Sequence, residues 1–509
     1  MFEKIRDKFS EIWYQKYLEM CCADWDFYIN STQENMEKMT KAQDNYSNLF
    51  KDENFYNEFK KIDKNNLNPH QQKQLKNILK DFEEELNTGD DLKQLRNKEN
   101  EIAQKYNSYV LKIDDKEVSR VDIQKILQTE TNPEIRKKAY EANIKAADLI
   151  AEDLKEFAKM RNAFALKKGF SNYFEYKLAE DYEVDMNDLS DLLEEVYSKS
   201  KDVIKTIIED KQNELKKFFG VNELKSYHYG LLLDNDPAKK VNECFRDKEQ
   251  IVEISKTTYK NMGYDVDKLL EEGKLTLDLF PRKGKNTHGF CFDIDAGKDA
   301  RILANLTNNT RSLDTLNHEM GHCVYALGIS RDLPFIDRQT YPAMTEAVAM
   351  MMGDLQKREN ILKNIVPDDI LEEFKQTFRK DEANFIAHSQ VIINFEKEMY
   401  KNPEQDLKQL WHDLKVKYLL RYENEEPDNG WASIPHYLSH PAYYQNYFRA
   451  TLIKAQIYNH LENLTDNPNT SSYLEKNLFQ YGTSMEENEL IERLTGKKLS
   501  ADDFVKSIL

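Results

Sequence analysis

The segment 317–322 reads Asn-His-Glu-Met-Gly-His, which places His318 and His322 four residues apart around Glu319. On a helix, residues four apart lie one turn apart on the same face, with about 5–6 Å between their Cβ atoms. This spacing suits two imidazoles that bind one Zn²⁺ and a glutamate that serves as a base beside it. The motif is short enough to arise by chance, so the residues around it decide what it means.

A third protein ligand is needed, because catalytic zinc sites hold three and keep the fourth position open. The segment 341–352 supplies a single carboxylate, Glu346, in an otherwise apolar helix that begins at Pro342. A buried carboxylate is costly unless it is paired or bound to metal, which makes an ordinary surface glutamate the poorer interpretation. We therefore predict one zinc ion held by His318, His322 and Glu346.

The helix expected over residues 311–327 is apolar on much of its surface, so its two histidines need partners. Ordinary core histidines are one alternative, but a shared zinc ion satisfies both rings at once. Gly321 costs a helix about 1 kcal/mol relative to alanine, which indicates that something approaches the backbone closely there. Asp314, one turn before His318, is a candidate to orient that histidine, and an exposed helix acid is the equally good alternative.

A predicted β-strand over residues 287–294 precedes the motif helix and carries His288, Gly289 and Cys291 as candidate substrate-binding residues. An edge strand beside the zinc helix can pair with an extended peptide through backbone hydrogen bonds, which do not depend on side-chain identity. Gly289 would permit close approach of such a peptide. A purely structural hairpin is the alternative that the sequence leaves open.

Histidine and tyrosine are concentrated in segment 436–448, where the candidates are His436, His440, Tyr444 and Tyr447. Tyr444 and Tyr447 are three residues apart and share one face of a helix. Hydroxyl and imidazole donors are the groups that stabilise a tetrahedral oxyanion, although an aromatic core helix would show the same pattern.

The composition favours a mostly helical fold, because the 509 residues include only 15 Gly and 12 Pro. The convincing strands are confined to residues 288–294 and 300–305. Loops are short and helices continue throughout, with no internal repeat, so we predict a single unit over residues 1–509.

A net charge of −18 argues against nucleic acid as a partner and, more weakly, against anionic membrane surfaces. Charged residues interrupt the apolar positions of the first 20 residues, and no stretch approaches 18 apolar residues, so we predict neither a signal peptide nor a membrane span. The five cysteines follow neither a metal nor a disulfide spacing. A cytoplasmic location is the simplest interpretation, and the oligomeric state is left open.

Taken together, these motifs resemble the angiotensin-converting-enzyme (peptidyl-dipeptidase A) family of zinc peptidases. The resemblance includes further short runs at Gly297-Lys298-Asp299, Arg301-Ile302 and Asp332-Leu333-Pro334. The 436–447 stretch, with Arg161-Asn162 and Gly169-Phe170, is also similar to thimet-type oligopeptidases, which are gluzincins as well. The resemblance implies a helical ellipsoid with two lobes around a deep central cleft and a small sheet next to the zinc helix. Residues 1–100 would form a helical lid and residues 246–450 the core that carries the active site.

The resemblance also implies a role for each candidate residue in peptide hydrolysis. His318, His322 and Glu346 would bind zinc, Glu319 would be the base, His288 would bind substrate, His436 and Tyr447 would donate to the oxyanion, and Tyr444 would contact substrate. The register of the downstream stretch leaves His440 as an alternative to His436.

Three positions depart from the pattern of the converting enzymes. Ile434 replaces a lysine that binds the substrate's C-terminal carboxylate, Asn446 replaces an arginine linked to chloride, and Met350 replaces an aspartate. We therefore predict zinc-dependent hydrolysis of short oligopeptides in the manner of a peptidyl-dipeptidase, with dipeptide release and chloride dependence less well supported by these positions than the zinc chemistry is. Endo-acting oligopeptidase and carboxypeptidase activities stay open, as does a zinc-stabilised peptide-binding protein, against which Glu319 argues because a structural zinc needs no base.

Overall fold

The computed structural model describes residues 1–86, 90–233, 236–461 and 463–509, and these are mostly helical. The chain forms two compact units. Unit 1 contains residues 1–89, 240–376 and 452–499, and unit 2 contains residues 90–239, 377–451 and 500–509. Two boundaries fall within long helices, α16 (Asp368–Lys401) and α19 (Tyr444–Leu461), and a third falls within the short α10 (Pro237–Asn242).

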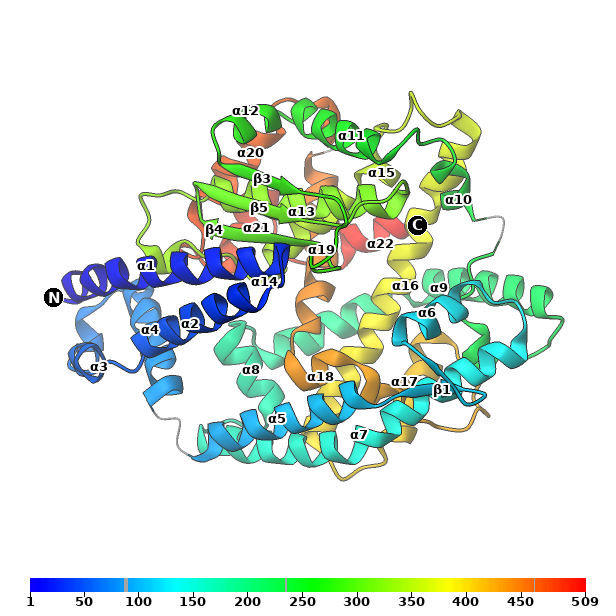
Figure 1. Cartoon of the computed structure of the whole chain (residues 1–509), viewed down its shortest axis with the longest axis horizontal. Coiled ribbons are helices and arrows are strands. Elements are labelled where there is room, and N and C mark those ends of the chain that lie inside the picture. The colour runs from blue at the N-terminus through cyan, green and yellow to red at the C-terminus, as the bar shows by residue number, and fades with distance from the viewer. Residues whose placement is uncertain (87–89, 234–235, 462) are drawn as a thin grey trace. The chain divides into compact units, whose positions relative to one another are not determined.

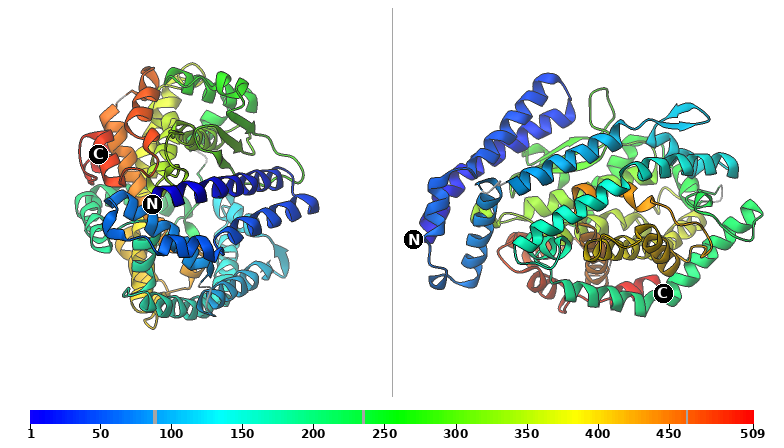
Figure 2. Two further views of the ribbon diagram at one scale, coloured as in Figure 1. Left: turned by 90° about the vertical axis from the view of Figure 1, so that its left-hand side faces the viewer. Right: turned by 90° about the horizontal axis from the view of Figure 1, so that it is seen from below.

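The helices that lie wholly in unit 1 include the helix that carries the sequence motif. They are α1 (Phe2–Ile29), α2 (Gln33–Leu49), α3 (Glu53–Lys60), α4 (Pro69–Leu86), α11 (Lys248–Asn261), α12 (Val266–Glu271), α13 (Thr310–Gly328), α14 (Pro342–Gly353), α15 (Leu355–Arg358), α20 (Thr470–Asn477) and α21 (Glu487–Thr495). The long helices α1 and α2 run side by side (Figure 2). Aromatic residues of α1, α3 and α4 form a buried cluster around Phe9.

A three-stranded sheet in unit 1 lies next to the motif helix (Figure 1). Its order is β3 (Leu275–Asp278), β5 (Asp299–Leu303), β4 (Phe290–Asp295), with β3 parallel and β4 antiparallel to β5. The motif helix α13 packs against β4 and β5, and Trp25 of α1 packs against Phe292 of β4 with 5.4 Å between ring centroids. The terminal strand β4 is therefore held between α1 and α13.

A second set of helices lies wholly in unit 2. They are α5 (Asp90–Ser108), α6 (Arg120–Thr129), α7 (Pro133–Lys167), α8 (Tyr173–Asp181), α9 (Met186–Phe219), α17 (Leu407–Leu419), α18 (Pro435–Ser439) and α22 (Asp502–Ile508). A hairpin of β1 (Leu111–Ile113) and β2 (Lys116–Val118) packs on α7 through β1. Helix α7 is capped by Asn132, whose side chain accepts a hydrogen bond from the Glu134 backbone at 2.9 Å.

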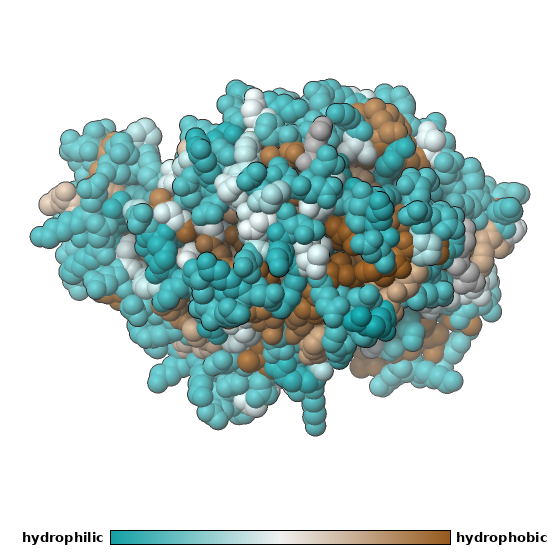
Figure 3. Space-filling view, turned by 90° about the horizontal axis from the view of Figure 1, so that it is seen from above, coloured by the Kyte–Doolittle hydropathy of each residue, from teal (hydrophilic) through white to brown (hydrophobic). Residues whose placement is uncertain are grey.

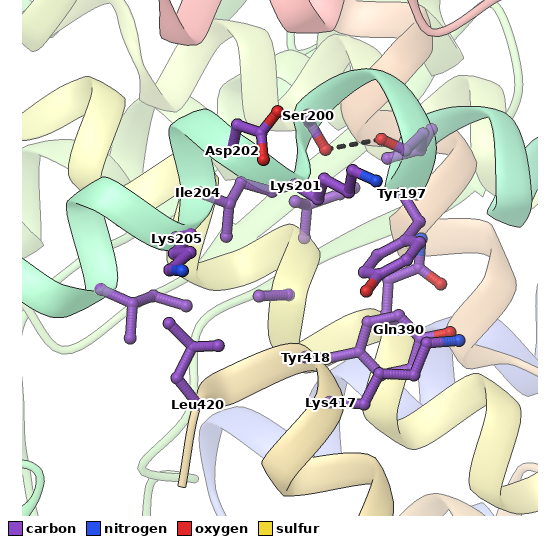
Figure 4. Close-up of a pocket in the computed structure, with 14 residues that line it drawn as sticks. Tyr197, Ser200, Lys201, Asp202, Ile204, Lys205, Gln390, Lys417, Tyr418 and Leu420 are labelled. Carbon is purple, nitrogen blue, oxygen red and sulfur yellow. Dashed lines mark hydrogen bonds between the residues drawn. The ribbon is translucent and has the colours of Figure 1, made fainter.

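A cavity of about 130 Å³ lies between α9, α16 and α17 in unit 2 (Figure 4). Its inner polar groups bond to the protein itself: Ser200 Oγ donates to the Val196 carbonyl at 2.6 Å, and Gln390 Nε2 donates to the Leu193 carbonyl at 2.9 Å. The cavity is therefore a gap in the packing of three helices.

The face drawn in Figure 3 is mostly hydrophilic, with smaller hydrophobic areas. Within the described part of the chain, no helix combines the length and the apolar character that a membrane span requires.

The predicted mostly helical class and the small sheet next to the zinc helix are confirmed. The strand predicted over residues 287–294 begins later, at Phe290, and β3 is a strand that the sequence reading missed. The ellipsoid, the cleft, the lid over residues 1–100 and the single unit stay predictions. The predicted core, residues 246–450, is divided between the two units at residue 376.

Candidate functional site

Helix α13 carries both histidines of the motif on one face. It begins after Asn309, whose side chain caps it by accepting a hydrogen bond from the Ser312 backbone at 2.8 Å. The Nε2 atoms of His318 and His322 lie 3.2 Å apart, with 4.8 Å between ring centroids. The two rings therefore direct the same nitrogen toward a common point.

Helix α14 brings the third donor to that point. Glu346 Oε2 lies 3.7 Å from His318 Nε2 and 3.9 Å from His322 Nε2, and the Glu346 side chain is only 12% exposed. A tetrahedral zinc ion with bonds of about 2.0–2.1 Å holds its donor atoms roughly 3.4 Å apart. Two imidazoles and one carboxylate at these separations fit zinc, and the three residues form a metal-binding group.

Gly321 permits the close approach of α13 and α14. A Cβ atom at this position would lie 2.8 Å from the Cα atom of Ala349 on α14, closer than real Cβ contacts allow. The glycine that the sequence reading connected with a close backbone approach therefore lies against the helix that carries Glu346.

A hydroxyl group orients one of the histidines. Thr345 Oγ1 lies 2.8 Å from His322 Nδ1, so a ring that binds metal through Nε2 can donate its remaining proton to this hydroxyl. Sequence reasoning missed Thr345, although its position directly before Glu346 on the same helix is a usable signal.

The charged groups that act on His318 are Asp354 and Lys454, which are 2.5 Å apart as an ion pair. The Asp314 carboxylate lies against Gly353, where a Cβ atom would be 2.8 Å from Asp314 Oδ1. Its predicted role in orienting His318 stays a prediction.

Burial keeps both histidines neutral at ordinary pH. It lowers the pKa of His318 to about 4 and the pKa of His322 to about 3. A neutral imidazole is the form that binds metal, so protons compete little for these donors near neutral pH.

Glu319 lies between the metal-binding group and β4. Burial raises its pKa to about 7, a hydrogen bond from the Cys291 backbone opposes this, and the charges of Glu346 and Asp314 raise it further. A Cβ atom on Gly289 would lie 3.5 Å from Glu319 Oε1. A carboxylate whose pKa is close to neutral pH is suited to take up and release a proton.

The candidate substrate residues around β4 differ in their surroundings. His288 is exposed and lies before the strand, where its backbone N–H donates to Asn286 Oδ1 at 2.9 Å. Cys291 is in β4, and its Sγ atom lies 2.9 Å from Cys323 Sγ of α13. The Cys291 side chain is therefore directed at the zinc helix, and its substrate-binding role stays a prediction.

The four downstream candidates are close to one another in unit 2. The ring of His436 lies 5.1 Å from Tyr444, 6.2 Å from Tyr447 and 6.2 Å from His440, measured between centroids. Burial and the neighbouring His440 lower the pKa of His436. His440 is exposed, and its Nδ1 lies 2.7 Å from Ser439 Oγ, whereas Tyr444 and Tyr447 are half-buried.

Comparison with known proteins gives two family matches. Residues 126–508, more than half of the chain, match the model of peptidase family M3, and residues 2–226 match the model of angiotensin-converting enzyme. The first match includes the zinc donors, Glu319 and the downstream cluster. A search of curated proteins found no match.

Proposed function

The chain belongs to peptidase family M3 and is a zinc metallopeptidase, and from this premise we propose that it hydrolyses short oligopeptides in the manner of a peptidyl-dipeptidase. The observation that carries the proposal is the position of Glu319, which lies beside the three metal donors and against the backbone of β4. A peptide that adds to the terminal strand of the sheet would place its backbone next to this carboxylate.

Each proposed residue has one task. His318, His322 and Glu346 hold zinc, which when bound supplies a Lewis acid for hydrolysis. Glu319 accepts the proton of the attacking water and passes it to the leaving amine. Tyr447 and His436 donate hydrogen bonds to the tetrahedral oxyanion.

The remaining candidates contact the peptide itself. We propose that His288, Gly289 and Cys291 bind its backbone near β4, and that Tyr444 contacts substrate from α19. His440 is the alternative to His436, although its greater exposure favours His436 as the donor. A cytoplasmic location belongs to the same proposal, because all five cysteines are free thiols.

An endo-acting oligopeptidase and a carboxypeptidase are the competing activities. Ile434 is the observation behind the endo-acting alternative, because an isoleucine offers no charge to hold a C-terminal carboxylate, which both a peptidyl-dipeptidase and a carboxypeptidase must bind. Mass spectrometry of one digested decapeptide separates the three. Successive losses of C-terminal dipeptides support the proposal, a single internal cut indicates an oligopeptidase, and losses of single residues indicate a carboxypeptidase.

Two controls make the digest decisive. A chelator should abolish cleavage, and Glu319→Gln should do so while the protein keeps its zinc. Binding of the decapeptide without any cleavage by the zinc-loaded protein would instead indicate a peptide-binding protein and overturn the proposal.

A further inference from the structure

The loop between α18 and α19 joins the two helices that carry the proposed oxyanion donors. His436 lies in α18, and Tyr447 lies in the first turn of α19. Residues 440–443 connect the two helices, and Ala442 has a φ of 59°, a left-handed conformation that is uncommon for a residue with a side chain. A backbone in this conformation persists only where the surrounding structure holds it.

A buried arginine holds the α18 side of this loop. Arg161 of α7 is 3% exposed, and it donates from Nη1 to the Tyr437 carbonyl at 2.7 Å and from Nη2 to the Leu438 carbonyl at 2.6 Å. Carbonyls in the last turn of a helix have no partner within the helix. The planar guanidinium reaches both at once, which the single ammonium of a lysine does not do in the same geometry.

The charge of Arg161 is balanced within unit 2. Its Nη1 also donates to Tyr400 Oη at 3.1 Å, and its Nη2 lies 3.6 Å from the carboxylate of Glu99 on α5. The guanidinium lies over the ring of Phe157 at 3.9 Å. With these contacts Arg161 is fixed in one orientation, so the two carbonyls that it binds are fixed as well.

A buried carboxyl group holds the α19 side. Glu396 of α16 is 1% exposed, and its Oε1 accepts a hydrogen bond from the Ala442 backbone at 2.9 Å. The same helix accepts a hydrogen bond from Tyr437 Oη at the Ile392 carbonyl, at 3.0 Å. Burial of a carboxyl group is costly, so its contact with the backbone of the left-handed residue is a specific arrangement.

We propose that Arg161 and Glu396 are positioning residues for the reaction, which fix the loop between α18 and α19 and thereby the orientation of His436 and Tyr447. This inference rests on the proposed function of those two residues. His436 directly precedes one carbonyl that Arg161 binds, and Tyr447 follows Ala442 by five residues along the start of α19. A displacement of about 1 Å in a positioned group lowers a rate by as much as about a hundredfold.

The chain contains a matched control for Arg161. Arg136 lies on the same helix α7, is 0% exposed, and also binds backbone carbonyls, those of Tyr227 at 2.8 Å, Tyr229 at 2.8 Å and Glu130 at 2.9 Å. Its contacts hold the end of α6 and the segment after α9, not the loop between α18 and α19. Replacement of either arginine by lysine removes buried contacts to several carbonyls, but only Arg161→Lys affects the proposed donors.

The test compares the two variants with the natural sequence as zinc-loaded full chains. It measures kcat and KM on a quenched decapeptide, and Tm of each protein. Both variants should lower Tm by a similar amount. Arg161→Lys should also lower kcat by roughly tenfold to a hundredfold with KM nearly unchanged, whereas Arg136→Lys should leave kcat within about twofold. Equal kcat values for the two variants would overturn the inference.

A double variant separates this inference from the proposed function. If Arg161 acts through Tyr447, then Arg161→Lys should add little to the kcat loss of Tyr447→Phe, and fully additive losses would contradict it. A Tyr447→Phe protein with normal kcat overturns the proposed oxyanion role. An impaired Tyr447→Phe protein together with an unimpaired Arg161→Lys protein overturns the inference alone.

Glu396 gives a second test if Arg161→Lys does not fold. Glu396→Gln keeps an oxygen that can accept the Ala442 N–H, and it should keep kcat within about twofold. Glu396→Leu removes the acceptor and should lower kcat by roughly tenfold or more. Equal kcat values for the two variants would contradict a positioning role.

Discussion

The zinc centre of unit 1 and the aromatic cluster of unit 2 are held in place in different ways. The zinc donors come from two neighbouring helices, α13 and α14, and His322 is oriented by Thr345, the residue next to another donor. The cluster around His436 depends instead on Arg161, which is 276 residues from Tyr437 in the chain. One site is organised locally along the sequence, and the other through distant contacts.

Because of this difference, substitutions should reduce the activity of the two sites in different ways. Substitution of a zinc donor removes a chemical group directly, whereas the cluster can lose function through a displaced backbone while all its side chains are present.

The largest expected effect is that of Glu319→Gln, which removes the proposed base but none of the metal donors. We expect kcat to fall by about 10²–10⁴-fold, the range for general acid–base groups, while zinc content measured by atomic absorption stays near one ion per chain. Glu346→Gln is the contrasting variant and should lose zinc. An active, zinc-loaded Glu319→Gln protein would remove Glu319 from the mechanism.

Tyr447→Phe tests the cluster with the loss of a single hydroxyl. We expect a kcat reduction of about 10²-fold with little change in KM, because an oxyanion donor acts only in the transition state. The neighbouring Tyr444→Phe should mainly raise KM. If Tyr447→Phe changes only KM, its hydroxyl binds substrate in the ground state.

Thr345→Val tests the support of the zinc centre. Without its hydroxyl, His322 loses the partner of Nδ1, and zinc affinity should fall by about 10–100-fold in a competition titration with a chelator. Thr345→Ser keeps the hydroxyl and should bind zinc nearly as well as the natural protein. Similar affinities for the valine and serine variants would show that the contact does not support the metal.

The smallest expected effect is the response of zinc affinity to pH. The pKa values of His318 and His322 are lowered to about 4 and 3, so protons should not compete with zinc until the pH falls well below the ordinary histidine value of 6.5. In Glu319→Gln, which removes another titrating group, affinity should change by less than about threefold between pH 7.5 and pH 5.5. A tenfold loss in this interval would contradict the neutral, buried state of the rings.

The same pKa shifts affect the stability of the metal-free protein. Unfolded histidines take up protons near pH 6.5, whereas the folded ones do not until about pH 4 and 3. The free energy of unfolding should therefore fall as the pH drops from 6.5 toward 4, because the unfolded state binds more protons. Chemical denaturation at several pH values, with and without zinc, measures this decrease.

Local patterns in the sequence predicted the zinc centre well. The spacing of His318 and His322, and a lone carboxylate in an apolar helix, identify the donors without any knowledge of distant contacts. Helix α14 begins at Pro342 as predicted, because proline suits the first turn of a helix. Helix periodicity and caps are properties of neighbouring residues, so a single sequence contains them.

Features that depend on distant contacts were not predictable in the same way. The short strand β3 is defined by its parallel pairing with β5, and no pattern within its four residues indicates that partner. In the sequence, Arg161 stands out only as part of a short run shared with the oligopeptidases, and no local pattern marks Glu396. Their contacts join helices that lie far apart in the chain, so their role becomes visible only in three dimensions.

Gly321 also has a consequence for the choice of metal. Because α13 and α14 touch where a side chain is missing, the gap between the histidine pair and Glu346 cannot adjust freely. Calcium needs six to eight oxygen ligands at about 2.3–2.6 Å and a flexible cage, neither of which two rigid helices with nitrogen donors supply. We expect cobalt(II), a tetrahedral ion of similar size, to replace zinc with retained activity, and larger ions to be excluded by the helix contact itself.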